Sequence, residues 1–250
     1  MRFETAEISL IGDRSDNQDR VSIVRHDRGA FLIVVDGMGG HAEGERAAEV
    51  ARQSFMESFE ASTDWIEQQE YVTRFLVDAI ERAHAAVAGI GESLPVENKP
   101  RATCAVCLTI DDTAWWAHVG DARIYLLRER GVAERTRDHS HVEVLLRQGL
   151  ISEAEIPGHP MRHYVECCLG GESDLPTETI RGGRELLSGD MILVCSDGLW
   201  SGVPDDVLGD SCREDRSISE WLGCVSEMAV AANAPYSDNT TAAALRILSH

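Results

Sequence analysis

The stretch that decides the fold is Val34-Val35-Asp36-Gly37-Met38-Gly39-Gly40-His41. The apolar run that leads into it, Phe31 to Val35, predicts a buried strand that ends abruptly at Asp36. Three glycines follow within four residues, and from Glu43 onward the apolar pattern becomes helical. A carboxylate at the end of a rigid strand, beside backbone that a ligand can approach closely, suits a hard cation or a phosphate. A plain strand-to-helix turn, with Asp36 as a turn residue, is the alternative.

The chain before this stretch reads as strands around a polar loop. Phe3 to Ile11 is weakly strand-like, and Val21 to Val24 predicts a strand that pairs with the one ending at Asp36. Between them lies a dense polar loop, Gly12-Asp13-Arg14-Ser15-Asp16-Asn17-Gln18-Asp19-Arg20. We therefore expect a hairpin with polar side chains at one end, and a solvated surface loop is the plain interpretation of residues 12–19.

The chain after the stretch predicts two amphipathic helices and then three strands. The first helix, from Glu43, carries an apolar residue at every fourth position, and the second runs from about Glu67 to Gly89. The strands are expected at 103–110, 114–119 and 122–127. Gly120-Asp121 joins the last two with glycine first, as a type II′ hairpin requires. Asp121 is then either a turn residue or a carboxylate at the tip of a rigid hairpin.

Cysteines and a histidine in these strands have structural interpretations. Cys104 and Cys107 have CxxC spacing, but positions three apart on a strand face opposite sides, which predicts two buried core thiols. His118 lies within an apolar strand and is interpreted as a core histidine.

Residues 138–187 differ from the rest of the chain. A short helix is expected from Ser140 to Gln148, and Ser152-Glu-Ala-Glu155 has the spacing of a capping box. Prolines and paired glycines follow, so we expect an irregular, mobile segment laid over the main body. Substrate contact is the functional interpretation of this segment, and a surface elaboration is the alternative.

Regular structure is predicted again toward the C-terminus. Met191 to Cys195 is an unbroken apolar run and predicts a buried strand, a helix follows at about 219–232, and Thr240 to Leu248 predicts a last strand. Strands and helices come in runs rather than in strict alternation, which favours an α+β fold. No composition break divides the sequence, so we expect one domain over residues 1–250.

Composition limits the classes of partner. The 250 residues contain 43 acidic and 23 basic side chains, a net charge of −20, which repels nucleic acid and anionic membranes. The odd number of cysteines, 7, and their scattered positions fit a reducing cytoplasm. No apolar segment typical of a signal peptide follows Met1, and no apolar run is long enough to span a bilayer. We expect a cytoplasmic protein without nucleic-acid or membrane partners, acting as a monomer.

Four aspartates stand at the ends of predicted strands or at a hairpin tip: Asp36, Asp121, Asp197 and Asp238. Aspartate is a poor strand residue, and turns alone could account for these positions. If the four converge, they cannot all stay ionised without a compensating charge. Divalent cations supply that charge, and coordination by oxygen alone selects Mg²⁺ or Mn²⁺ over zinc.

The motifs that hold these aspartates occur in a characteristic order: RSDNQD at 14–19, DGMGGH at 36–41, VGDAR at 119–123, SDGLW at 196–200 and DNTT at 238–241. Together they resemble the bacterial form of the metal-dependent type 2C protein serine/threonine phosphatases, the PPM family. Asp138-His139-Ser140 and the stretch to Gly171 resemble the flap of that family. The resemblance implies an αββα sandwich of two mainly antiparallel sheets flanked by helix pairs, a flap-like insertion at 138–187, and hydrolysis of phosphoserine and phosphothreonine in proteins.

The resemblance also implies roles for single residues. Asp36 would bridge two Mn²⁺ or Mg²⁺ ions, with the Gly37 carbonyl, Asp197 and Asp238 as further ligands. Asp121 would help to hold a third, weaker ion, and Asp19 would act near the second ion through water. Arg14 would bind the substrate phosphate with its planar fork. A water between two cations would supply the attacking hydroxide, without a phosphoenzyme.

Three positions depart from the family pattern or stay open. Gln18 stands where many members have a glutamate ligand, and an amide brings no charge. Met38 replaces the histidine that eukaryotic members carry after the DG pair, often assigned as general acid. His41 is a candidate substitute for it, although a role in shaping the loop explains it equally well.

Other classes of phosphate enzyme lack their motifs here. No cysteine is followed six residues later by arginine, and the only lysine, Lys99, precedes a proline, which excludes a Walker A loop. The remaining alternative is a pseudophosphatase, catalytically weak or inactive, that uses the fold to bind phosphoproteins. Such a protein would be expected to have lost metal-binding aspartates, whereas all four are present.

Overall fold

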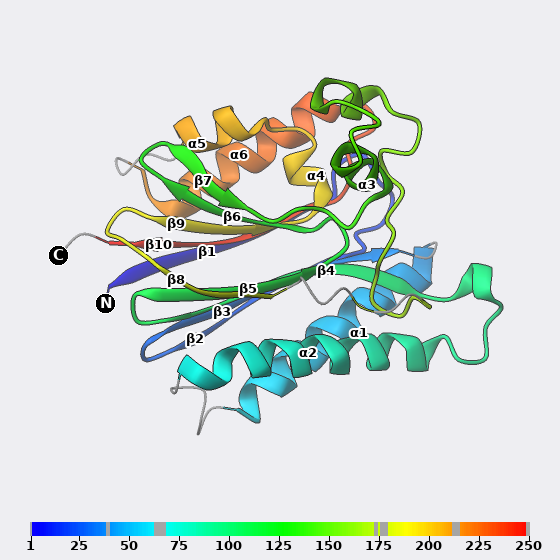
Figure 1. Cartoon of the computed structure of the whole chain (residues 1–250), viewed down its shortest axis with the longest axis horizontal. Helices are drawn as coiled ribbons and strands as arrows, with labels where there is room; N and C mark the ends of the chain where they lie inside the picture. Colours follow the sequence, from blue (N-terminus) through cyan, green and yellow to red (C-terminus); the bar gives the residue numbers. More distant parts are fainter. Residues whose placement is uncertain are drawn as a thin grey trace.

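Two five-stranded antiparallel sheets, stacked face to face, form the centre of the molecule (Figure 1). The computed structural model describes residues 2–38, 41–62, 69–172, 175, 180–211 and 216–248. The first sheet has the order β1 (Phe3–Leu10), β10 (Thr240–Ile247), β9 (Met191–Cys195), β6 (Arg123–Arg128), β7 (Gly131–Arg135). The second has the order β2 (Asp19–His26), β3 (Gly29–Met38), β4 (Arg101–Ile110), β5 (Thr113–Val119), β8 (Ile180–Glu185).

Helices cover the outer face of each sheet, which gives four layers and confirms the predicted αββα sandwich (Figure 1). On the second sheet lie α1 (His41–Glu60) and α2 (Gln69–Ile90). On the first lie α4 (Asp197–Trp200), α5 (Asp205–Ser211) and α6 (Ile218–Asn233). The predicted stripe of α1 is buried, with Ala47, Ala51, Phe55 and Phe59 each at most 3% exposed.

The unbroken apolar runs are explained by strands that are covered on both faces. In β3, Phe31, Ile33 and Val35 pack in the core beneath α1 and α2. The alternate residues of β3 pack in the core between the two sheets. The same alternation separates Cys104, which faces the helices, from Cys107, which faces the other sheet. The prediction of two buried core thiols is therefore confirmed.

The predicted hairpin at Gly120-Asp121 is wrong, because β5 and β6 belong to different sheets. β5 pairs with β4 and β8, whereas β6 pairs with β7 and β9. Gly120 adopts a φ of +92°, and a Cβ at this position would lie 2.4 Å from Cγ2 of Thr103. Glycine therefore lets the chain cross from one sheet to the other, which leaves Asp121 at the edge between them.

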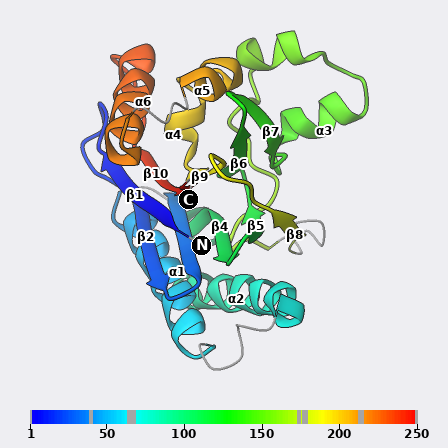
Figure 2. The same cartoon turned by 90° about the vertical axis from the view of Figure 1, so that its left-hand side faces the viewer.

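The segment 138–187 is less irregular than predicted, because its last part is strand β8, paired with β5. The sequence of β8, Ile-Arg-Gly-Gly-Arg-Glu, lacks the alternation that indicates a strand. The short elements β7 and α5 were not predicted either. Residues 138–172, called here the flap segment, carry α3 (His141–Arg147) and the 3₁₀ helix Glu153–Gly158, and extend to one side of the sheets (Figure 2). The capping box is confirmed, since Ser152 N–H and Oγ–H donate to Glu155 Oε2 at 2.9 and 2.7 Å.

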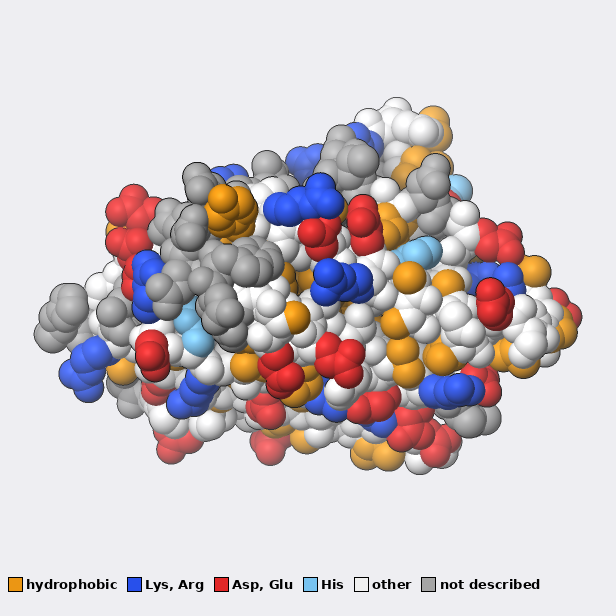
Figure 3. Space-filling model, turned by 90° about the horizontal axis from the view of Figure 1, so that it is seen from below, with side chains coloured by type: hydrophobic (Ala, Val, Ile, Leu, Met, Phe, Trp, Pro, Cys, Tyr) orange, Lys and Arg blue, Asp and Glu red, His pale blue; other side chains and the backbone are white. Residues whose placement is uncertain are grey.

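Charged side chains of both signs cover the face formed by α1 and α2, where basic groups are scattered among acidic ones (Figure 3). Among the described residues, no helix has both the length and the apolar character needed to cross a membrane.

Candidate active site

Segments that are distant in the sequence meet at one end of the sandwich and enclose a cavity of about 380 Å³. It lies where β3 and β9 end, where β10 begins, and where the chain crosses from β5 to β6. The lining residues come from the polar loop, these strand ends and the flap segment: Arg14, Ser15, Asp16, Gln18, Asp36, Gly37, Met38, Asp121, His163, Val165, Asp197, Asp238 and Asn239. The four aspartates and the arginine singled out from the sequence are therefore brought together.

Asp19 lies behind this wall rather than in it. It faces Asp36 across the β2–β3 pair, and its side chain is only 3% exposed. Ser196 Oγ–H donates a hydrogen bond to Asp19 Oδ2 at 2.7 Å. Burial raises the pKa of Asp19 to about 7, against the lowering effect of that hydrogen bond. Asp19 is thus a buried neighbour of the cavity.

The carboxylates around the cavity raise one another's pKa values. Burial raises the pKa of Asp36 well above its usual range, and the charges of Asp19 and Asp197 raise it further. The pKa of Asp197 is raised in the same way, by burial and then by Asp121. Burial raises the pKa of Asp121 to about 6. Added positive charge would favour the ionised form of every carboxyl in this group, and their oxygen donors fit Mg²⁺ or Mn²⁺.

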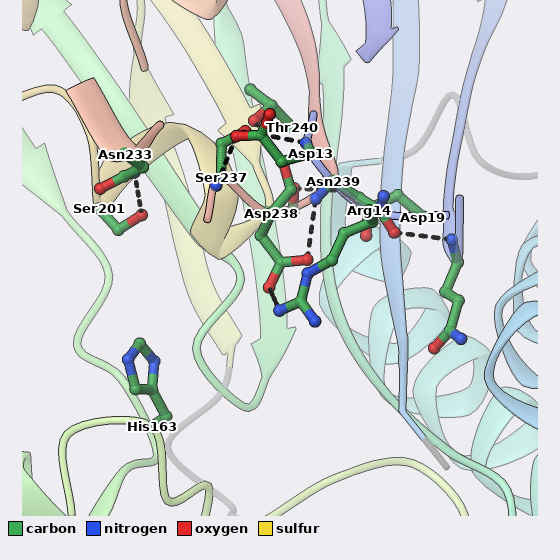
Figure 4. Close-up of polar contacts among 12 residues, drawn as sticks. Asp13, Arg14, Asp19, His163, Ser201, Asn233, Ser237, Asp238, Asn239 and Thr240 are labelled. Carbon is green, nitrogen blue, oxygen red and sulfur yellow. Dashed lines mark hydrogen bonds and ion pairs between the residues drawn. The ribbon is translucent and has the colours of Figure 1, made fainter. Parts of the chain in front are cut away.

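Some of these donors are engaged with protein partners. Arg14 Nη2 lies 2.8 Å from Asp238 Oδ2, and the Asn239 N–H donates to Asp238 Oδ1 at 2.8 Å (Figure 4). Within the described part of the chain, no three acidic, histidine or cysteine side chains already form a coordination group. An ion that bound Asp238 through Oδ2 would therefore compete with the guanidinium of Arg14.

The loop that carries Arg14 is fastened to the start of β10 by Asn239, a residue whose role the sequence analysis missed. Its Nδ2 donates to the carbonyl oxygens of Ile11 and Asp16, both at 2.9 Å. Its Oδ1 accepts from the Gln18 N–H at 2.8 Å, and the residue is 6% exposed. Every polar group of this amide is used, so the DN pair of the last motif fixes the path of the loop.

Asp13 adds a second fastening between the same segments. Its Oδ2 accepts hydrogen bonds from the N–H and the hydroxyl of Ser237, at 3.0 and 2.7 Å. These hydrogen bonds lower the pKa of Asp13. The loop and the start of β10 therefore form one hydrogen-bonded unit (Figure 4).

Gly37 is required for packing, whatever its carbonyl binds. A Cβ on Gly37 would lie 2.0 Å from the carbonyl oxygen of Gly44, and one on Gly44 would lie 2.2 Å from Oε1 of Gln18. The two glycines let the end of β3 pack directly on the first turns of α1. Close approach to an ion is thus not needed to explain the glycine of the DG pair, and the Gly37 carbonyl stays a predicted ligand.

A buried polar group supports Asp121 from behind. Asp138 receives two hydrogen bonds from Arg123, each 2.7 Å long, and this guanidinium lies 3.5 Å above the ring of Trp200. The indole Nε1–H of Trp200 donates to the carbonyl oxygen of Asp121 at 2.9 Å. The group links the VGDAR, DHS and SDGLW motifs, and we call it the Asp121 brace.

The brace continues through His139 to Gly120, the residue before Asp121. Nδ1 of His139 accepts from the Gly120 N–H at 3.1 Å, and the His139 N–H donates to the Gly120 carbonyl at 2.8 Å. The ring stacks on His118, with 4.4 Å between centroids. His118 is 5% exposed and Nε2 lies 2.7 Å from the carbonyl oxygen of Arg137, which confirms its interpretation as a core histidine.

The remaining sequence candidates have different outcomes. Gln18 and Met38 are the two positions at which this sequence departs from the family pattern, and both line the cavity. The side chain of His41 falls outside the described part of the structure, so its two interpretations stay open. His163 and Val165 of the flap segment also line the cavity, and nothing in their sequence context had indicated them.

Known proteins are similar to this chain both in sequence and in fold. The sequence model of the family described as protein phosphatase 2C matches residues 9–234. The serine/threonine phosphatase stp of Listeria welshimeri is 31% identical over 208 residues, which cover 83% of this chain and 81% of the relative. The serine/threonine phosphatase PstP/Ppp of Mycobacterium tuberculosis has 28% identity and a TM-score of 0.83 over 99% of both chains. The catalytic domain of PstP in complex with two manganese ions has 27% identity and a TM-score of 0.78, again over 99% of both chains.

Proposed function

Because the chain belongs to the protein phosphatase 2C family, we propose that it is a metal-dependent protein phosphatase that hydrolyses phosphoserine and phosphothreonine. One observation carries the proposal: carboxylates with raised pKa values and one arginine line the same cavity. Carboxylates in this state favour cations, and an arginine beside them favours an anionic substrate. A phosphate ester is a substrate that uses both bound cations and an arginine, because its phosphoryl oxygens carry negative charge.

The proposed ligands of two ions, Mn²⁺ or Mg²⁺, are Asp36, the Gly37 carbonyl, Asp197 and Asp238. Asp121 is the proposed ligand of a third, weaker ion, and Asp19 the proposed outer partner through water. When bound, the ions lower the pKa of a water molecule and offset negative charge on the phosphoryl oxygens. These residues are far apart in the sequence but stand at or beside the ends of strands in the two packed sheets. Because the sheets hold the strand ends in place, this arrangement supports a rigid site.

Arg14 is the proposed phosphate-binding residue. Its side chain is 57% exposed and stands at the cavity, so its guanidinium is accessible to an entering phosphate. In the structure it makes a single hydrogen bond to Asp238, and a phosphate dianion offers two acceptor oxygens and more charge. The loop fastened by Asn239 keeps the backbone of Arg14 in place while the side chain exchanges partners.

The partners and the compartment can be proposed only as classes, in contrast to the roles of single residues. Phosphorylated proteins, substrates of a serine/threonine kinase, are the proposed partners, in a signalling role in the cytoplasm. The net charge of −20 favours partners other than nucleic acid or anionic membrane, and a monomer is the expected form. We take residues 1–250 as one catalytic domain, with residues 138–187 as a flap-like insertion over the site.

The test is Mn²⁺-dependent hydrolysis of p-nitrophenyl phosphate by the purified protein. We expect activity that a chelator removes, and that Asp197→Ala lowers by about a thousandfold because a ligand of an ion is lost. Binding of a phosphorylated protein without any metal-dependent hydrolysis would instead support the pseudophosphatase alternative. The presence of Asp36, Asp121, Asp197 and Asp238 at the cavity favours the enzyme.

A further inference from the structure

His163 faces the candidate active site from the flap segment, opposite the strand ends. Figure 4 shows its imidazole on a different segment from the Arg14–Asp238 pair, and all three residues line the cavity. His163 and Val165 are the flap residues that line the cavity. The cavity therefore has two walls of different origin: one from strand ends and the polar loop, and one from the flap segment.

The tautomer of His163 is fixed by its neighbour Arg162. The Arg162 Nε–H donates to His163 Nε2 at 2.7 Å. Nη1 of the same guanidinium donates to the carbonyl oxygen of Pro157 at 2.9 Å. A guanidinium has donors only, so Nε2 must offer its lone pair and the ring proton must sit on Nδ1. Burial and the charge of Arg162 also lower the pKa of His163, which favours this neutral form.

A neutral ring with its N–H on Nδ1 is suited to donate a hydrogen bond to a carbonyl oxygen. The cavity of about 380 Å³ holds about a dozen waters of ~30 Å³ each, far more space than a phosphate group needs. Arg14 and the carboxylates occupy the opposite wall, so the phosphate belongs there and the remaining space on the His163 side is left for main chain. Met161 and Tyr164, which flank His163, are 37% and 53% exposed and offer apolar surface beside it.

We propose that His163 is a specificity-determining residue that donates its Nδ1–H to the main chain of a phosphorylated protein segment. The inference rests on the proposed phosphatase function and adds the feature that this wall recognises: peptide backbone next to the phosphorylated residue. A small aryl phosphate has no such backbone. His163 thus separates phosphopeptides from small phosphate esters.

The experiment compares two substrates, p-nitrophenyl phosphate and a short alanine-rich phosphothreonine peptide, with Mn²⁺ in excess. For His163→Ala we expect KM for the peptide to rise about fivefold to tenfold, the effect of one hydrogen bond, with kcat nearly unchanged. The kcat/KM for p-nitrophenyl phosphate should stay within about twofold of the wild type.

Two replacements at the same position sharpen the test. The amide nitrogen of asparagine sits one bond from Cγ, as Nδ1 does, so His163→Asn should restore the peptide KM. His163→Gln places the nitrogen one carbon further and should behave like alanine. Arg162→Ala should raise the peptide KM less than His163→Ala does, because the tautomer is then no longer fixed. Arg147→Ala, an exposed flap substitution away from the cavity, is the control.

The outcomes distinguish a failure of the role proposed for His163 from a failure of the proposed phosphatase function. Equal losses on both substrates, or a fall in peptide kcat at unchanged KM, would overturn the specificity role. Failure of asparagine to restore the peptide KM would overturn the Nδ1 assignment. A wild-type protein that hydrolyses neither substrate would overturn the proposed function itself. Circular dichroism of each variant verifies that the fold is retained.

Discussion

The two walls of the cavity are held in different ways. On the strand-end wall, Asn239 makes three hydrogen bonds with the Arg14 loop, and the Asp121 brace joins Arg123, Asp138 and Trp200. On the flap wall, the hydrogen bond that orients His163 comes from the adjacent, exposed Arg162. The strand-end wall, proposed for chemistry, is thus held by several hydrogen bonds between distant segments. The flap wall, proposed for recognition, depends on contacts between residues that are neighbours in the sequence.

This difference indicates how such a site can vary. Ligands of ions must hold their positions closely, because a small misplacement costs rate. A residue that reads peptide backbone tolerates more adjustment, and its surroundings can change without touching the ligands. Substitutions of the ion ligands and of the residues that support them should therefore alter kcat and stability, whereas substitutions on the flap wall should alter KM.

Removal of the Asn239 amide should have the largest effect. Asn239→Ala leaves carbonyls of Ile11 and Asp16 and the Gln18 N–H without their partner, which costs about 2–5 kcal/mol of unfolding free energy in total. The Arg14 loop is released, so kcat/KM should fall by about a hundredfold or more. Urea unfolding and p-nitrophenyl phosphate kinetics measure the two effects.

Arg14→Ala is the matched comparison for that variant. It removes only the guanidinium, so it should raise KM for phosphate substrates without weakening Mn²⁺ binding, and stability should stay nearly unchanged. If Asn239→Ala proved no worse than Arg14→Ala, the loop would not depend on its fastening.

The Asp121 brace should give an intermediate effect. Asp138→Asn leaves the nearly buried Arg123 without its counter-charge, which should lower the unfolding free energy by about 3 kcal/mol. We also expect a higher Mn²⁺ concentration for half-maximal activity, because Asp121 loses part of its support.

A similar ion pair elsewhere in the molecule is the control. Arg128 and Asp190 pair at 2.6 Å near the start of β9, at the end opposite the cavity. Asp190→Asn should therefore lower stability without altering the Mn²⁺ dependence. An identical shift in both variants would mean that the brace has no specific link to the site.

The smallest expected effect concerns pH, at the junction of the two walls. Burial, and then the charge of His118, lower the pKa of His139 to about 3 in the folded protein. In the unfolded chain a histidine titrates near ~6.5, so between these values the unfolded state binds more protons and stability falls as pH drops. At pH 5 the contribution of His139 to this loss relative to pH 7 should be ~2 kcal/mol, about 4–8 °C in Tm, and the raised pKa values of the buried aspartates act in the opposite direction.

Replacing His139 by asparagine tests this assignment. The asparagine carbonyl can still accept from the Gly120 N–H, but it does not titrate, so the Tm difference between pH 7 and pH 5 should shrink. An unchanged slope would place the acid sensitivity elsewhere.

The apolar runs predicted buried strands because both faces of strands such as β3 and β9 are covered, whereas the sandwich itself was implied only by the family resemblance. The sequence singled out Asp36, Asp197 and Asp238 because each stands at the end or start of a predicted buried strand, and Asp121 because it stands at a predicted turn. It failed at Gly120, since a glycine before aspartate fits a hairpin as well as a crossover between sheets. Only the pairing of β5 and β6 with different partners distinguishes the two.

The residues missed in the site share a physical cause. Asn239 acts through hydrogen bonds to Ile11 and Asp16, more than 220 positions away, and no local pattern encodes such contacts. His163 sits in a segment without periodicity, where only the path of the folded chain reveals which side chains reach the cavity. The role of the Gly37 carbonyl as an ion ligand stays a prediction, and packing against Gly44 is by itself reason enough for a glycine at this position.

The pairing of β1 with β10 has a practical consequence. Phe3 lies opposite Ile247, and the Leu248 N–H donates to the Arg2 carbonyl at 3.0 Å, so both ends of the described chain lie side by side (Figure 1). Leu10 and Thr240, at the other end of the same pair, lie toward the cavity. An affinity tag or fusion partner at either end would lie away from the cavity of the candidate active site. A short peptide linker could also join the two ends, so that new ends could be opened elsewhere on the surface.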